Sequence, residues 1–153
     1  MYMKAEDAIS GQEGTLFASI GDKTIEVGEC KNITAKITKK KSEFKALGYR
    51  GTQHKAVGWS GTGTMTIHYA SSRWTKMMVD YAKTGKDTYF KLVVTNEDPT
   101  SNIGKQQVTL LDCNMDEAEI AKLDVESEYL DATANFTFSD VELPHEFDEL
   151  TLH

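Results

Sequence analysis

Apolar and polar residues alternate with a period of two along most of this chain, and Gly, Asn and Asp interrupt the alternation at short intervals. In residues 61–69, for example, Met65 and Ile67 alternate with Thr64 and Thr66. Such alternation places apolar side chains on one face of a β-strand, whereas an amphipathic helix needs a period of 3.6 residues. The pattern therefore predicts a mainly β fold, an antiparallel sheet closed into a barrel or packed as a sandwich.

Eight segments have strand character. They are residues 15–20, 23–27, 29–38, 61–69, 88–95, 106–115, 118–129 and 132–139. Gly21-Asp22 between the first two predicts a tight hairpin. A long polar stretch rich in Gly and Lys, residues 39–63, is predicted to be a loop, and loops of this length in a compact domain usually have a function.

One helix is predicted at about residues 72–84. Trp74, Met77, Met78 and Tyr81 recur at the spacing i, i+3, i+4 and i+7, which places them on one face, and we expect this face to pack on the core. Gly85 favours a left-handed end to the helix.

The chain has 153 residues, which predicts one domain over 1–153 with flexible arms at 1–12 and 141–153. No apolar run is long enough to cross a bilayer, so no membrane segment is expected. Two cysteines rule out a disulfide framework and favour a reduced, intracellular place of synthesis.

Charge is divided between two regions. Residues 36–55 carry a net charge of +6, and residues 96–153 carry −13, within a total of −7. This polarity predicts head-to-tail attraction between copies, although a solvated loop and a solvated sheet face would have the same composition. Nucleic-acid binding is disfavoured, because the acidic half would repel phosphates.

Two of the predicted strands alternate apolar residues with carboxylates. Leu111, Cys113 and Met115 alternate with Asp112, Asn114 and Asp116, and Leu123 and Val125 alternate with Asp124, Glu126 and Glu128. One face is thus apolar, and the other carries five acids, Asp112, Asp116, Asp124, Glu126 and Glu128. Carboxylates side by side across strands cost stability, so they indicate either a functional face or a solvent-facing one.

Signals of catalysis are weak. The four histidines lack metal-ligand spacing, and Gly58–Thr62 resembles a nucleophile elbow without its closing glycine. We expect no enzymatic activity, no cofactor and no metal.

Several stretches of the chain resemble the core tail-tube proteins of contractile phage tails and phage-like particles of Gram-positive bacteria, the PBSX type. In order, they are Ala8–Phe17, Gly48–Gly63, Met77–Phe90, Val108–Asn114, Leu123–Glu128 and Phe136–Asp140. The resemblance covers nearly the whole chain.

The resemblance implies a β-sandwich subunit that forms hexameric rings, which stack into a hollow tube inside a sheath. Its implied partners are further copies of itself and the sheath, tape-measure and baseplate proteins. The lumen would carry DNA without specific binding in a phage, or ions in an R-type bacteriocin. Assembly would occur in the bacterial cytoplasm, before incorporation into the tail or bacteriocin particle.

In this setting the 39–63 loop is expected to contact the adjacent ring. The residues expected to do so are Lys39, Lys40, Lys41, Lys45, Arg50, Lys55 and Trp59. The five acids named above are expected to line the lumen, with the sheath-facing surface as the alternative.

Three other interpretations remain open. A tube protein of a type VI-like secretion system would share the architecture. A carbohydrate-binding β-sandwich would need aromatics at one face, for which Tyr49, Trp59 and Tyr69 are the candidates. A hydrolase would need a pocket with a perturbed carboxylate.

Overall fold

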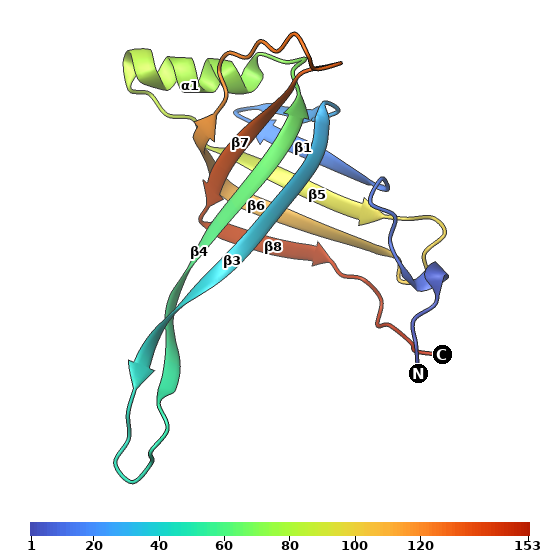
Figure 1. Ribbon diagram of the computed structural model, residues 1–153, viewed down its shortest axis with the longest axis vertical. Helices are drawn as coiled ribbons and strands as arrows, with labels where there is room; N and C mark the ends of the chain where they lie inside the picture. The colour runs from blue at the N-terminus through green and yellow to red at the C-terminus, as the bar shows by residue number, and fades with distance from the viewer.

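The period-two pattern forms two packed layers of antiparallel strands in the computed structural model, which describes all 153 residues (Figure 1). The elements in chain order are η1 (Ala5–Asp7), β1 (Gly14–Ile20), β2 (Lys23–Glu26), β3 (Cys30–Phe44), β4 (Gln53–His68), α1 (Arg73–Thr84), β5 (Phe90–Glu97), β6 (Lys105–Ala118), β7 (Asp131–Phe138) and β8 (Asp140–His145). The predicted mainly β fold with one flanking helix is confirmed.

The strands pair in the order β2-β1-β5-β6-β7-β4-β3, with β8 on the other side of β6. β2 and β3, at the two ends of this order, do not pair with each other, so the fold is an open sandwich rather than a closed barrel. β6 belongs to both layers, because its first half lies between β5 and β8 whereas its second half pairs with β7.

A β-bulge bends β6 from one layer into the other. Asp112 has a φ of 53°, and the pairing of β6 with β5 shifts register beside it. An inserted residue of this kind kinks a strand and reverses its alternation. Leu110 and Cys113 are therefore both buried, and Leu111, which the alternation assigned to the apolar face, is only partly buried.

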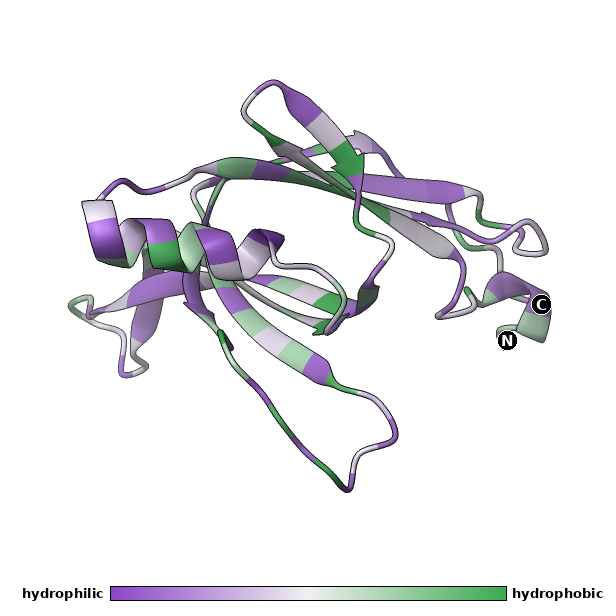
Figure 2. Cartoon of the chain, turned by 90° about the horizontal axis from the view of Figure 1, so that it is seen from above, coloured by the Kyte–Doolittle hydropathy of each residue, from purple (hydrophilic) through white to green (hydrophobic).

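The core is one cluster of fifteen buried apolar side chains between the layers. α1 lies across one end of the space between the layers (Figure 2). Its Trp74 is 2% exposed and packs with its ring 5.6 Å from the ring of Phe90. At twelve residues, α1 is too short to cross a membrane, and it is the only α-helix of the chain.

The helix matches its predicted bounds within one residue, but its predicted apolar face is only partly buried. Met77 and Met78 pack against the core, whereas Tyr81 is 53% exposed. Only the first two turns of α1 contact the core, so the expectation that Tyr81 packs inside is wrong. Gly85 ends the helix with a φ of 73°, and its N–H donates to the carbonyl of Tyr81.

The predicted loop at 39–63 is largely a β-hairpin. β3 and β4 pair from Cys30 opposite Ile67 to Phe44 opposite Gln53, and only residues 45–52 lie outside the two strands. Two glycines at the body end of β4 have a packing role. A Cβ atom at Gly61 or Gly63 would overlap the ring of the cross-strand Phe138 or Phe136 of β7. Glycine there leaves room for an aromatic ring over the strand.

The strand predicted at 118–129 does not form, because β6 ends at Ala118 and residues 119–130 are a loop. The Asp124 carboxylate accepts hydrogen bonds from the Glu126 N–H (3.1 Å) and the Ser127 hydroxyl (2.7 Å). Such local bonds offer the backbone a turn in place of a sheet ladder. Leu123 and Val125, expected on a buried face, are 97% and 100% exposed.

The two chain ends lie together (Figure 1). Tyr2 and His153 exchange two backbone hydrogen bonds of 2.9 and 3.0 Å. Residues 141–145, expected in a C-terminal arm, belong to β8 and pair with β6.

Candidate assembly surfaces

The distal half of the β3–β4 hairpin projects beyond the sandwich. β7 pairs with β4 only over Gly61–His68, so residues 53–60 of β4 pair with no strand except β3. Eight residues of strand span about 26 Å at 3.3 Å per residue. We call residues 37–60, which form the projecting hairpin in Figure 1, the arm. Every residue of the arm except Ala46 is exposed.

All six basic residues expected to contact an adjacent ring lie on the arm. Lys39, Lys40 and Lys41 follow one another on β3, Lys45 and Arg50 lie at the tip, and Lys55 lies on β4. None of them makes an ion pair within the subunit. Their charge is therefore directed to solvent or to a partner.

Trp59 stands at the base of the arm, opposite Lys39. Its ring lies 6.2 Å from that of Phe138, and the residue is 42% exposed. Trp59 thus continues the core face of β4 beyond Gly61, where the pairing of β4 with β7 ends.

The arm also exposes apolar side chains that the charge pattern did not reveal. Each is at least 42% exposed, and the set is Ile37, Phe44, Leu47, Tyr49, Val57 and Trp59. Exposed apolar residues gathered on one element are typical of an interaction surface. The signal was present in the sequence, but a predicted loop provides no face on which to group them.

Open strand edges are the second surface. The outer sides of β2, β8 and β3 have no strand partner, and β3 is fifteen residues long. An unpaired edge presents free N–H and C=O groups, and a protein must either protect such an edge or pair it with another chain. The run of lysines on β3 is one such protection for an isolated subunit.

The five acids expected to line a lumen do not share one face. Asp112 and Asp116 lie on β6, whereas Asp124, Glu126 and Glu128 lie in the loop after it. The expectation of two neighbouring carboxylate-rich strands is therefore wrong. The hydrogen bond from Ser127, followed by that from the Glu126 N–H, holds the pKa of Asp124 below its ordinary value.

The residues of the other chemical hypotheses are scattered. No group of three or more His, Cys, Asp or Glu side chains is placed to hold a metal ion. Cys30 and Cys113 are free, and burial raises the pKa of Cys113 to about 12, which leaves an unreactive thiol.

The three aromatics of a carbohydrate-binding hypothesis do not form a platform. Tyr49 lies at the arm tip and Trp59 at the arm base. Tyr69 follows β4 at the other end of the sandwich, where its hydroxyl donates to the carbonyl of Ile120.

An open β-sandwich with unpaired strand edges and a projecting hairpin is typical of a subunit of an assembly, because other copies of the chain can pair with its edges and contact its hairpin. Comparison with known proteins identifies the family. The family model described as phage tail tube protein matches residues 1–145, and the chain belongs to this family.

Relatives and solved structures agree with this assignment. The chain is 42% identical over 149 residues to the phage-like element PBSX protein XkdM of Bacillus subtilis (strain 168), covering 97% of this chain and 99% of that protein.

Two solved structures share the fold at low identity. One is a chain of the sheath–tube complex of PVC, an extracellular contractile injection system, with a TM-score of 0.66, 10% identity and coverage of 91% and 93%. The other is the SPP1 tail tube, with a TM-score of 0.66, 12% identity and coverage of 92% and 81%.

Proposed function

We propose that this protein is the structural subunit of the inner tube of a contractile phage tail or phage-like particle. The observation that carries the proposal is the 42% identity to a phage-like element protein along almost the full length of both chains. In this proposal the subunits form hexameric rings, the rings stack into a hollow conduit, and a contractile sheath surrounds it. The same identity favours a phage-like particle over a type VI-like secretion tube.

Each surface of the subunit has a task in such a tube. Pairing of open strand edges between neighbours satisfies the free backbone groups and closes a ring. The arm is long enough to leave its own ring, and Lys39, Lys40, Lys41, Lys45, Arg50, Lys55 and Trp59 are its proposed contact residues. Asp112 and Asp116 on β6 are proposed to face the lumen or the sheath, whereas Asp124, Glu126 and Glu128 lie in the 119–130 loop, at the end of the subunit opposite the arm.

The subunit performs no reaction in this proposal and needs no cofactor. Its role is to form a passage. When the sheath contracts, the hollow tube would conduct DNA from a phage head or, in an R-type bacteriocin, ions. An acidic lumen would repel phosphates and let DNA slide without binding. Tape-measure and baseplate proteins would set the length of the tube and its starting point, in the cytoplasm of the producing bacterium.

Electron microscopy of the concentrated, purified protein tests the proposal. We expect negatively stained tubes with a central channel and sixfold symmetry in end views. Sedimentation across a concentration series should show polymer in equilibrium with small species. A protein that stays monomeric at every concentration, and that also fails to polymerise when co-expressed with its sheath and baseplate proteins, would contradict the proposal.

A further inference from the structure

The loop between β6 and β7 exposes apolar side chains that the subunit does not use. We call residues 119–130 the rim loop. Leu123 and Val125 are 97% and 100% exposed, and Ile120 and Tyr129 are 55% and 58% exposed. Side chains this exposed add nothing to the core, and their grouping within ten residues is typical of an interaction surface.

The rim loop is acidic as well as apolar. It contains four carboxylates, Glu119, Asp124, Glu126 and Glu128, against the single cation Lys122. Only Glu119 makes an ion pair, at 3.4 Å to Lys122. The other three carboxylates have no ion-pair partner in the subunit.

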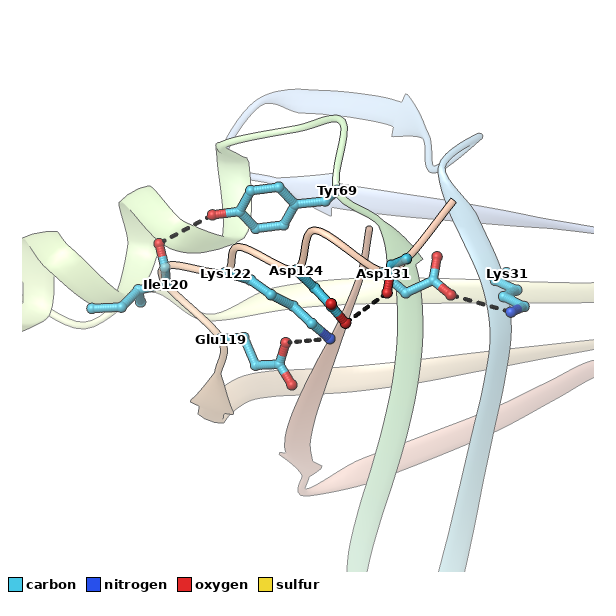
Figure 3. Close-up of polar contacts among 8 residues, drawn as sticks. Lys31, Tyr69, Glu119, Ile120, Lys122, Asp124 and Asp131 are labelled. Atoms are coloured by element: carbon cyan, nitrogen blue, oxygen red, sulfur yellow. Dashed lines mark hydrogen bonds and ion pairs between the residues drawn. The ribbon is translucent and has the colours of Figure 1, made fainter. Parts of the chain in front are cut away.

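The start of the rim loop is bonded to the body, and a turn in its middle is closed by a hydrogen bond within the loop (Figure 3). The Tyr69 hydroxyl donates to the carbonyl of Ile120 at 3.4 Å, and the turn at Asp124 is closed by its bond to Ser127. At the end of the loop, the Tyr129 ring packs edge-on to His68, with Lys31 over its face at 5.7 Å. The exposed apolar groups are thus presented on a supported surface.

The rim loop and the arm lie at opposite ends of the molecule (Figure 1). β4 connects the two ends: Gln53 lies next to the arm tip, and His68, fifteen residues later, pairs with Asp131 at the end of the rim loop. The arm carries unpaired cations and exposed apolar residues, and the rim loop carries unpaired carboxylates and exposed apolar residues. Each surface is complementary to the other, but one chain cannot bring them together.

We propose that the arm of one copy docks on the rim loop of a second copy, in the next ring along the tube. The inference rests on the tube function proposed above and names the surface that receives the arm. Opposite charge orients the approach, and the apolar groups of both surfaces are buried on contact. The contact is heterologous, because the two surfaces differ, so repetition produces an open stack rather than a closed dimer.

Charge reversal on the two surfaces tests the docking. One variant reverses Lys39, Lys40 and Lys41 to Glu on the arm, a second reverses Glu119, Glu126 and Glu128 to Lys on the rim loop, and a third combines both sets. A matched control reverses Glu13, Glu146 and Glu149 to Lys, which changes net charge equally at exposed sites outside the rim loop, the arm and the open strand edges. Circular dichroism and melting temperature establish that each variant is folded.

We expect each single-surface variant to raise the concentration needed for polymerisation at least about tenfold, since like charges now face each other. The combined variant should polymerise near the wild-type concentration, because opposite charges are restored, and so should the control. A rim-loop variant that polymerises like wild type, a combined variant that stays blocked, or a control blocked as strongly as the rim-loop variant would each overturn the docking.

Replacing Leu123 and Val125 with Ser gives a second measurement that does not depend on charge. Because both side chains are fully exposed, we expect an unchanged melting temperature and a higher polymerisation threshold at both low and high salt. A threshold equal to that of wild type would overturn the docking. If the wild-type protein itself forms no tube, the tube function fails, whereas normal wild-type tubes with unaffected rim-loop variants refute only the docking.

Discussion

The two halves of the β3–β4 hairpin have the same pairing and opposite environments. Near the body, Gly63 and Met65 of β4 lie next to β7, and Met65 is completely buried. In the arm, Val57 and Trp59 of the same strand are 64% and 42% exposed. Only the inner half contributes to the core, so the outer half is free to carry residues that serve contacts between copies.

Two tryptophans provide the largest expected contrast. Trp74 is buried against Phe90, so its replacement by Ala should lower the free energy of unfolding by about 3–5 kcal/mol. Trp59→Ala on the arm should cost less than about 1 kcal/mol, because the side chain is already partly in water. Urea denaturation of both variants measures the difference, and equal losses would show that the arm is part of the core.

Two glycines of β4 provide the next contrast. Gly63→Ala should destabilise the subunit by about 1–3 kcal/mol, because its Cβ overlaps the ring of Phe136. Gly58→Ala on the arm, with no atom within 4 Å of the new Cβ, should be neutral or slightly stabilising. Thermal melts in parallel test this, and a neutral Gly63→Ala would mean that the aromatic packing over β4 is loose.

The smallest effect is expected from a carboxylate of the body far from the arm. Asp98 accepts hydrogen bonds from the N–H groups of Ser10 and Thr100 and from the Thr100 hydroxyl, and these bonds hold its pKa below the ordinary value. Its stabilising contribution is therefore complete at pH values well above its ordinary pKa of 3.8 and is lost as the pH falls through its lowered folded-state pKa.

Asp98→Asn should lower the free energy of unfolding at pH 7 and should remove the Asp98 contribution to the loss of stability in acid. Asp22→Asn, in the exposed β1–β2 turn, is the control. The free energy of unfolding of both variants is measured between pH 2 and pH 7. An equal loss of stability in the two variants would contradict the stabilising role of the Asp98 carboxylate.

The sequence predicted correctly those helices and strands whose local residue pattern agrees with their position in the folded structure. The β1–β2 hairpin, α1 and its end at Gly85, and β5 all occur close to their predicted positions. In each of them the local periodicity and the turn residue indicate the same structure. The cations of the arm were also visible as a charge cluster, although their role in stacking stays a prediction.

The errors occur where distant residues or side-chain bonds override the local pattern. Residues 39–60 suggested a loop because they are polar and rich in Gly and Lys, but β3 continues to Phe44 and β4 begins at Gln53, because the two strands pair along this stretch. Leu123 and Val125 suggested a buried strand face, but the turn at Asp124 leaves them in solvent. The rim loop was thus missed as a surface because its apolar residues were assigned to the core.

The sequence by itself determined the β class, the single helix, the division of charge and the membership of the tail-tube family, because these depend on residue type and short-range order. Tertiary structure decided where each strand ends, how β6 passes between the layers and which apolar residues remain outside. Those outcomes depend on packing between segments far apart in the chain, and a one-dimensional pattern does not contain that information.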